Sequence, residues 1–318
     1  MIYKLKQNRV SRTYHGGKNI DAFTGEHFLK KGCYPEDWTA SATFVKTPGG
    51  ATEGIGVSLD GSTITDIIGS DTLPILVKLL DSDERLVVQV HPTVEFAAEN
   101  LNSQFGKTEC WYFLSCADDA CVYLGFKLGI TKELWRETIL SGDSAEILSL
   151  LHRVPVKQGD FVFVNGGVPH AIGSGCFMIE LQEPSDLMVV AETKTVTGNP
   201  MPKYRIDMGL GMDKALDMYD YTGCTFDEIK EKYLSSPAAE CNAITEICSE
   251  RQTDKFSMSM ACGNTAYKCG RKYAVVIVTS GAGELNNTAV KRGDRLFCAG
   301  EEKLVFCGGE DFNVIICE

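Results

Sequence analysis

Short apolar runs bounded by turn-forming residues dominate the chain. Examples are LPILVKLL (73–80), CWYFLS (110–115), DFVFVNG (160–166) and YAVVIVTSG (273–281). Each run has the length of a strand and is rich in β-branched or aromatic residues, and Gly, Pro, Asn or Asp residues separate the runs. The pattern predicts a mostly β protein, built as a sandwich or a barrel.

Helical periodicity is confined to a few segments. TKELWRETILSGDSAEILSLLHRV has apolar residues at helical spacing and predicts one or two amphipathic helices, inserted between strands at about residues 131–153. TVEFAAENLN (93–102), MDKALDMYDY (212–221) and FDEIKEKYL (226–234) are shorter helix candidates. The chain is therefore expected to combine many strands with a small helical insertion.

A weak internal repeat divides the chain. VPVKQGDFVFVNGG (154–167) and TAVKRGDRLFCAGE (288–301) share a V-K-x-G-D turn followed by a strand and glycine. Two related β-barrels would explain the repeat, although Gly-Asp turns also recur by chance in β proteins. Only the first copy leads into a histidine, in VPHAIG. We therefore expect an N-terminal catalytic domain (1–235) and a structural C-terminal domain (236–318).

Composition and charge narrow the class of protein. The 318 residues carry a formal net charge of −12 without a basic patch, which argues against nucleic acids or anionic membranes as main partners. The apolar runs are too short to span a membrane and the N-terminus lacks a signal-peptide core, so we expect a cytoplasmic protein. Thirteen cysteines without a CxxC pair argue against a disulfide framework or a thiolate zinc site, and they favour a reducing compartment.

Polar side chains interrupt the apolar stretch LVVQVHPTVEFAAENLNSQFGKTECWYFL (86–114). Strand alternation places Gln89 and His91 on one face, and it places Lys107 and Glu109 together on a common face. His170 follows the turn NGGVP, at the expected start of another strand. We expect one concave barrel face to collect Gln89, His91, Glu109 and His170.

These four side chains suit a metal ion. Imidazoles and carboxylates are usual ligands of Zn²⁺, whereas the amide of glutamine is not. The alternative for each histidine is a core residue that is hydrogen-bonded to the backbone. His15, His27 and His152 lie in polar or helical surroundings, and we expect them at the surface. A metal held by one carboxylate and neutral partners would keep a positive charge and polarise oxygens of a polyol.

Five motifs follow one another along the chain, between about residues 38 and 219: LPILVKLLDSDERLVVQVHP, GKTECWYFL, VPVKQGDFVFVNGGVPHAIG, IELQEPSD and DKALD. In this order they resemble the type I phosphomannose isomerases, in their short bacterial form. That family consists of cupin-fold zinc enzymes that interconvert mannose 6-phosphate and fructose 6-phosphate. The resemblance implies two cupin-like (jelly-roll) β-barrels, a sugar-phosphate substrate and one zinc ion per chain. The implied zinc ligands are Gln89, His91, Glu109 and His170.

The same resemblance implies further site residues. Lys78 and Lys107 match lysines of the family's site, and Glu180 matches a site carboxylate. Aldose–ketose isomerisation moves a proton between C1 and C2 through a cis-enediol, so it needs a base, charge stabilisation for the oxygens and an anchor for phosphate. Glu180 and Lys107 are the catalytic candidates and Lys78 is a substrate-binding candidate. The sequence leaves open whether Glu180 or a group at the metal is the base.

Two positions depart from the family pattern. Val87 stands where the family commonly has a serine, and Val190 stands where it commonly has an arginine. A charge-assisted contact contributes roughly 1.5–3 kcal/mol, so phosphate or transition-state binding should be weaker unless another residue substitutes. Arg205, in PKYRIDMG, is the nearest candidate for substrate binding; otherwise the substrate differs.

Other functions compete with this interpretation. One is an isomerase acting on a different sugar or sugar phosphate. Another is a cupin that binds metal and sugar without turnover, which Val87 and Val190 favour. The third is a non-haem iron oxygenase, because two histidines and a carboxylate can form a facial triad, but the glutamine and the KTECWY context argue against it. A monomer or a homodimer is expected.

Overall fold

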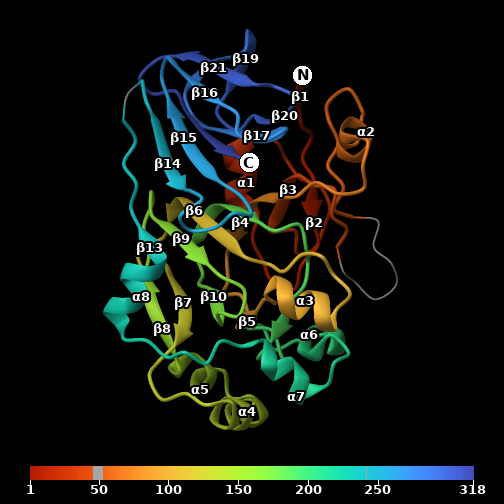
Figure 1. Cartoon of the computed structure of the whole chain (residues 1–318), viewed down its shortest axis with the longest axis vertical. Helices are drawn as coiled ribbons and strands as arrows, with labels where there is room; N and C mark the ends of the chain where they lie inside the picture. Colours follow the sequence, from red (N-terminus) through yellow and green to blue (C-terminus); the bar gives the residue numbers. More distant parts are fainter. Residues whose placement is uncertain (46–52, 241) are drawn as a thin grey trace.

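The computed structural model describes residues 1–45, 53–240 and 242–318, and its strands form four sheets within these ranges (Figure 1). The prediction of a mostly β protein is confirmed. The sheets are layered, because shared hydrophobic clusters join the five-stranded sheet to the seven-stranded one, the seven-stranded to the six-stranded, and the six-stranded to the four-stranded. The two closed barrels expected from the sequence stay a prediction.

Two sheets build the N-terminal part of the chain. The seven-stranded sheet contains, in spatial order, β13 (Leu234–Ser235), β9 (Phe161–Val164), β6 (Glu109–Cys116), β11 (Cys176–Gln182), β4 (Leu76–Ser82), β3 (Glu36–Ala40) and β2 (Arg9–Val10). The five-stranded sheet contains β12 (Val189–Val190), β5 (Gln89–Val90), β10 (His170–Ile172), β7 (Cys121–Phe126) and β8 (Leu151–Pro155). The two sheets enclose a common apolar core.

The other two sheets come mostly from the C-terminal part. The six-stranded sheet contains β1 (Ile2–Lys4), β20 (Arg295–Ala299), β17 (Tyr273–Ser280), β22 (Asn313–Cys317), β15 (Met258–Cys262) and β14 (Ile244–Cys248). The four-stranded sheet contains β16 (Thr265–Lys268), β21 (Lys303–Gly308), β18 (Ala282–Leu285) and β19 (Thr288–Lys291). The first strand pairs with β20, so the start of the chain joins the C-terminal sheet.

Short helices connect the strands. They are α1 (Lys18–Thr24), α2 (Ile64–Ile68), α3 (Val94–Asn100), α4 (Lys132–Ser141), α5 (Ser144–Ser149), α6 (Lys203–Asp207), α7 (Met212–Ala215), the 3₁₀ turn η1 (Leu216–Met218) and α8 (Phe226–Tyr233). The helices α3, α4, α5, α7 and α8 confirm predictions, whereas α1, α2 and α6 were not predicted. Figure 1 shows α4 and α5 at the end of the molecule farthest from the C-terminal sheets. Within the described ranges, no helix is long and apolar enough to cross a membrane.

The predicted helical insertion ends too late. β8 begins at Leu151 and pairs with β7, so residues 151–153 are strand rather than helix. This strand buries His152, whose exposed fraction is 6%, and the His152 Nε2 atom lies 2.8 Å from the Cys224 carbonyl oxygen. The prediction that His152 lies at the surface is therefore wrong. His15 and His27 are exposed, as predicted.

The apolar run RLVVQVH (85–91), in which strand alternation placed Gln89 and His91, forms a shorter strand than expected. Only Gln89 and Val90 form a strand, β5. The backbone N–H of Val88 donates to the carboxylate of Glu192, at 2.6 Å, instead of to a strand carbonyl. The carboxylate of Glu192, far along the sequence, therefore replaces the strand carbonyl that the apolar pattern predicted as acceptor.

Alternation along β11 decides which side chains face the five-stranded sheet. Phe177, Ile179 and Leu181 pack in the cluster shared with the six-stranded sheet, whereas Cys176 and Met178 pack in the cluster shared with the five-stranded sheet. Because successive side chains of a strand point to opposite faces, the side chain of Glu180 points toward the five-stranded sheet. The polar residues considered next lie between these two layers.

Candidate functional site

Pairing of short strands brings the predicted metal ligands together. His170, at the start of β10, is the direct partner of Gln89 on β5, and His91 follows that strand. Glu109 opens β6 in the facing sheet. The ring of Trp111, two residues farther along β6, packs edge-on against the ring of His170 at 5.5 Å. The two layers therefore meet at these side chains.

The cluster is compact and buried. The His91 Nε2 atom lies 3.3 Å from Glu109 Oε2, and the His170 Nε2 atom lies 3.3 Å from Glu109 Oε1. The potential ligand atoms of these three residues all lie within 4.8 Å of one another. The amide nitrogen of Gln89 lies 3.3 Å from the His170 Nε2 atom, and a half-turn of that amide would bring its oxygen to the same place. These residues could bind a metal ion.

Backbone carbonyls orient both imidazoles for coordination. The His91 Nδ1 atom lies 2.9 Å from the Leu187 carbonyl oxygen, and the His170 Nδ1 atom lies 2.9 Å from the Val168 carbonyl oxygen. Because a carbonyl only accepts, each Nδ1 carries the proton, and each Nε2 keeps its lone pair toward Glu109. A ring fixed in this way is the usual arrangement of metal-binding histidines. The donor set therefore fits a divalent cation.

Lys107 places a positive charge at the same cluster. Its Nζ atom lies 2.6 Å from the His91 Nε2 atom and 2.7 Å from a Glu109 carboxylate oxygen. Burial and the Lys107 charge lower the pKa of His91 to about 3. Burial alone would raise the pKa of Glu109, but the Lys107 charge leads the effects that outweigh it, so this pKa lies well below its usual range. His91 is thus held neutral and Glu109 ionised, as metal ligands need to be.

A second buried ion pair lies beside the cluster. Glu180 on β11 and Lys78 on β4 are direct cross-strand partners, and the Lys78 Nζ atom lies 2.8 Å from a Glu180 oxygen. Lys107 lies 4.0 Å from the same oxygen. Burial raises the pKa of Glu180, and the charge of Lys78 opposes this rise only in part. The pair therefore combines a carboxylate that is easily protonated with a fixed ammonium group.

A cavity of about 230 Å³ connects these groups with the surface. Gln89, Lys107, Lys78 and Glu180 line it, and so does the predicted substrate residue Arg205. Apolar side chains form part of the same wall: Leu80, Leu86, Val87, Ile172, Met188, Val196 and Met201. The cavity therefore brings the predicted catalytic and substrate residues to one space, next to the histidine–glutamate cluster.

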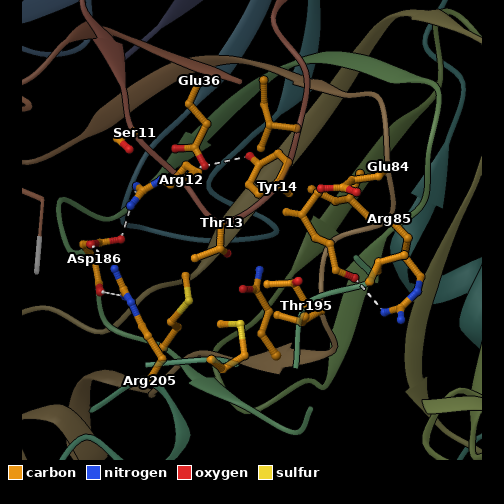
Figure 2. Close-up of a pocket in the computed structure, with 18 of the residues that line it drawn as sticks. Ser11, Arg12, Thr13, Tyr14, Glu36, Glu84, Arg85, Asp186, Thr195 and Arg205 are labelled. Carbon is orange, nitrogen blue, oxygen red and sulfur yellow. Dashed lines mark hydrogen bonds and ion pairs between the residues drawn. The ribbon is translucent and has the colours of Figure 1, made fainter. Parts of the chain in front are cut away.

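Two arginines share one aspartate at the cavity. The Arg205 Nη2 atom lies 2.7 Å from Asp186, and the Arg12 Nη2 atom lies 3.3 Å from the other oxygen of that carboxylate (Figure 2). Arg12 also pairs with Glu36, at 2.9 Å. Figure 2 shows Arg12 and Arg205 approaching Asp186 from opposite sides, with Tyr14 beside Glu36. The cavity wall thus carries two guanidinium groups close together.

Arg12, Tyr14 and Glu36 were not predicted as site residues. Arg12 and Tyr14 lie in the polar segment after β2, where no strand or helix periodicity marks them. Glu36 lies on β3, and its carboxylate accepts hydrogen bonds from the Tyr14 hydroxyl and the Trp38 indole, each at 2.7 Å. Burial would raise the pKa of Glu36, but Arg12 and Lys78 lower it to about 2. Strand pairing brings these residues to the cavity, because β2 pairs with β3 and β3 pairs with β4.

Comparison with known proteins agrees with this geometry. No protein-family model matches the chain. The probable mannose-6-phosphate isomerase GmuF of Bacillus subtilis is 33% identical over 220 residues, which are 69% of this chain and 65% of that protein. The mannose-6-phosphate isomerase ManA of Bacillus subtilis is 46% identical over 116 residues, 36% of either chain. This chain thus spans 65% of the first relative and a smaller share of the second.

Solved structures align over nearly the whole chain. The mannose 6-phosphate isomerase of Bacillus subtilis aligns with a TM-score of 0.78 and 22% identity, over 100% of this chain and 99% of that chain. The apo form of the Salmonella typhimurium enzyme aligns with a TM-score of 0.71 and 15% identity, over 99% and 98%. The chain has the fold of the phosphomannose isomerases. Together with the similarity to the two curated relatives, this shared fold confirms the resemblance recognised in the sequence.

The two departures from the phosphomannose isomerase pattern lie together in this fold. Val87 and Val190 are buried and pack with Met201, and Met188 and Ile206 cover them. Val87 also lines the cavity. An apolar cluster therefore stands where the family commonly has a serine and an arginine. Arg205, four residues beyond Met201, supplies a guanidinium at the same cavity.

Proposed function

We propose that this chain is a zinc-dependent aldose–ketose isomerase that interconverts mannose 6-phosphate and fructose 6-phosphate through a cis-enediol intermediate. One observation carries the proposal: the buried His91–Glu109–His170 cluster adjoins a cavity whose wall holds the Lys78–Glu180 pair. The names of the curated relatives support the substrate, and the shared fold supports the chemistry.

The proposed metal ligands are Gln89, His91, Glu109 and His170, with one zinc ion per chain. Nitrogen and carboxylate ligands in a buried site are typical of zinc. A divalent cation held there would stabilise negative charge that develops on the sugar oxygens. The two backbone carbonyls behind the imidazoles keep the Nε2 atoms in place while substrate enters and leaves.

Glu180 is the proposed base. Isomerisation needs a group that takes a proton from C2 of the aldose and returns it to C1, and the reverse for the ketose. A carboxylate with a raised pKa suits both steps, because it takes up the proton more readily than an ordinary carboxylate and can still release it. Lys78 holds this carboxylate in place at 2.8 Å. Lys107, 4.0 Å from the same oxygen, would stabilise charge on the enediol oxygens.

Arg12 and Arg205 are the proposed phosphate anchor. Guanidinium groups recognise phosphate through paired N–H donors, and these two converge on Asp186 at the cavity wall. The carboxylate keeps the two positive charges close together before substrate arrives. This arrangement would replace the arginine that the family pattern has at the position of Val190.

Lysine at either arginine position should weaken substrate binding. Arg12→Lys and Arg205→Lys keep the positive charge but remove the fork of donors, so we expect the KM for mannose 6-phosphate to rise roughly 10- to 100-fold in each variant. Steady-state kinetics measure this effect. Arg153→Lys is the matched control, because Arg153 is exposed and donates to the Asp119 carbonyl outside the cavity. Unchanged KM in both variants would remove these arginines from the substrate site.

A direct assay tests the function as a whole. Purified chain containing zinc is incubated with mannose 6-phosphate, and fructose 6-phosphate is measured with a coupled enzyme. We expect turnover that chelation abolishes and zinc restores. Zinc bound without turnover on any of several aldose phosphates would instead indicate a protein that binds sugar without isomerising it. Iron in place of zinc would favour an oxygenase.

The apolar cluster around Val87 favours a second candidate, an isomerase acting on a different sugar. If mannose 6-phosphate is the substrate, Val87→Ser should lower its KM about 3- to 10-fold, because the new hydroxyl can bond to the substrate at the cavity wall. Val87→Ala is the control for the smaller volume of the side chain, and it should not lower the KM. An equal effect of both variants would favour a substrate that contacts this wall through apolar groups.

Further expectations accompany the proposal. We infer a cytoplasmic location, a monomer or homodimer, and a division of the chain near residue 235 into a catalytic and a structural domain. The second copy of the internal repeat, unlike the first, is not followed by a histidine, which supports that division. Size measurement of the purified chain in solution tests the oligomeric state.

A further inference from the structure

Two cysteines face each other in the seven-stranded sheet, at the end of β6 and β11 that lies away from the cavity. Cys116 ends β6 and Cys176 begins β11, and the two residues are direct partners in the antiparallel register. Both are thiols rather than disulfide-bonded cysteines. We propose that Cys116 and Cys176 form a reversible disulfide by exchange with small disulfides such as oxidised glutathione. This inference does not depend on the proposed isomerase activity.

The backbone geometry suits a cross-strand disulfide. The Ala117 N–H donates to the Gly175 carbonyl at 2.8 Å, and the Cys176 N–H turns away from β6 to the Ser82 hydroxyl on β4, at 3.2 Å. In an antiparallel ladder the adjacent pair, Cys116 and Cys176, is then a non-hydrogen-bonded pair. Cα atoms of such a pair lie about 4.5 Å apart, within the range of about 4.4–6.8 Å that disulfides span. The register of the two strands therefore suits the bond.

The two thiols already interact. A hydrogen bond with Cys176 lowers the pKa of Cys116, against the effects of burial and of the Asp160 charge, and Lys157 adds a smaller lowering. Cys116 is only half-buried, so a small disulfide can reach it. Cys176 is buried, and the interaction with Cys116 and burial raise its pKa. Cys116 is therefore the attacking thiol and Cys176 the resolving one.

The exchange balances in two steps. The Cys116 thiolate attacks one sulfur of oxidised glutathione, the glutathione S–S bond breaks, and one glutathione thiolate leaves. The Cys176 thiol then gives its proton to solvent and attacks the Cys116 sulfur, which expels the second glutathione thiolate. The pair loses two electrons and two protons, and oxidised glutathione is reduced to two thiols. No further oxidant is needed.

The pair lies outside the candidate functional site. Neither thiol lines the cavity, although both strands also carry site carboxylates, Glu109 on β6 and Glu180 on β11. A β-bulge between Phe177 and Met178 separates the thiols from Glu180 along the sheet. The disulfide would join β6 and β11 at the ends farther from Glu109 and Glu180, and it would leave the side chains of the cavity in place.

Mass spectrometry of the folded, full-length chain tests the proposal. The chain is incubated with oxidised glutathione, free thiols are alkylated, and the products are mapped as peptides. We expect a species lighter by two hydrogen atoms, with the peptides of Cys116 and Cys176 linked, and we expect dithiothreitol to reverse it. Cys307→Ser, which removes an exposed cysteine on β21, should leave this product unchanged.

Two variants separate the steps. Cys116→Ser should lose the linked product entirely, whereas Cys176→Ala should stop at a mixed disulfide between Cys116 and glutathione. Circular dichroism of each variant establishes that it is folded. A Cys116 that stays fully alkylatable in the folded chain would overturn the proposal. So would a stable mixed disulfide in the unsubstituted chain, or a link from Cys176 to its buried neighbour Cys121.

Discussion

Replacing His170 by alanine is expected to remove the bound metal and the activity together. The His170 Nε2 atom lies 3.3 Å from Glu109 and beside Gln89, so its loss takes one imidazole out of a set of four ligands. Loss even of a group that orients a ligand costs about 10- to 100-fold in affinity or activity, so we expect a larger loss here. Elemental analysis should fall from about one zinc per chain to nearly none, and kcat/KM should fall more than about 100-fold.

His152→Ala is the matched control for this variant. His152 is also buried and also donates to a backbone carbonyl, that of Cys224, but it lies outside the cluster. It should lose some stability and keep its metal. Full activity in His170→Ala would show that the ligand set is wrong. Loss of activity with metal retained would make His170 a substrate residue instead.

The sequence predicted the residues of the cluster because their signal is local. Gln89, His91 and Glu109 are polar residues within apolar runs, and strand alternation places each on a definite face. The short turn before His170 places it at a strand start, where the structure pairs it with Gln89. Family motifs then supplied the connection between segments that are far apart in the sequence.

The rest of the cavity depends on tertiary packing. Arg12 and Glu36 meet at 2.9 Å because β2 pairs with β3 and places Val10 opposite Glu36, and nothing in their local sequence indicates this. The same limit explains β5, where the Glu192 carboxylate accepts the Val88 N–H in place of a strand carbonyl. A polar residue in an apolar run can be recognised from sequence, whereas a polar residue in a polar segment needs the fold.

Replacing Glu180 by glutamine is expected to reduce turnover strongly while the metal stays bound. Glutamine has nearly the same shape and can still contact Lys78, which lies 2.8 Å away, but it cannot accept the C2 proton. General acid–base catalysis contributes typically about 10²- to 10⁴-fold, so kcat should fall by that factor with a small change in KM. Zinc analysis should still give about one ion per chain. A loss of zinc would show that Glu180 supports the metal rather than the proton transfer.

The pH profile distinguishes this role from a structural one. Because burial raises the pKa of Glu180, and because the base works only when ionised, kcat/KM should fall as the pH drops through this raised pKa. The acid limb should therefore lie above the usual carboxyl value of about 4.3, and the residual activity of Glu180→Gln should lack it. Glu318→Gln removes a buried carboxylate remote from the cavity, bound to the Tyr267 hydroxyl at 2.7 Å. That control should keep the acid limb, so the loss of the limb in Glu180→Gln alone would identify Glu180 as the base.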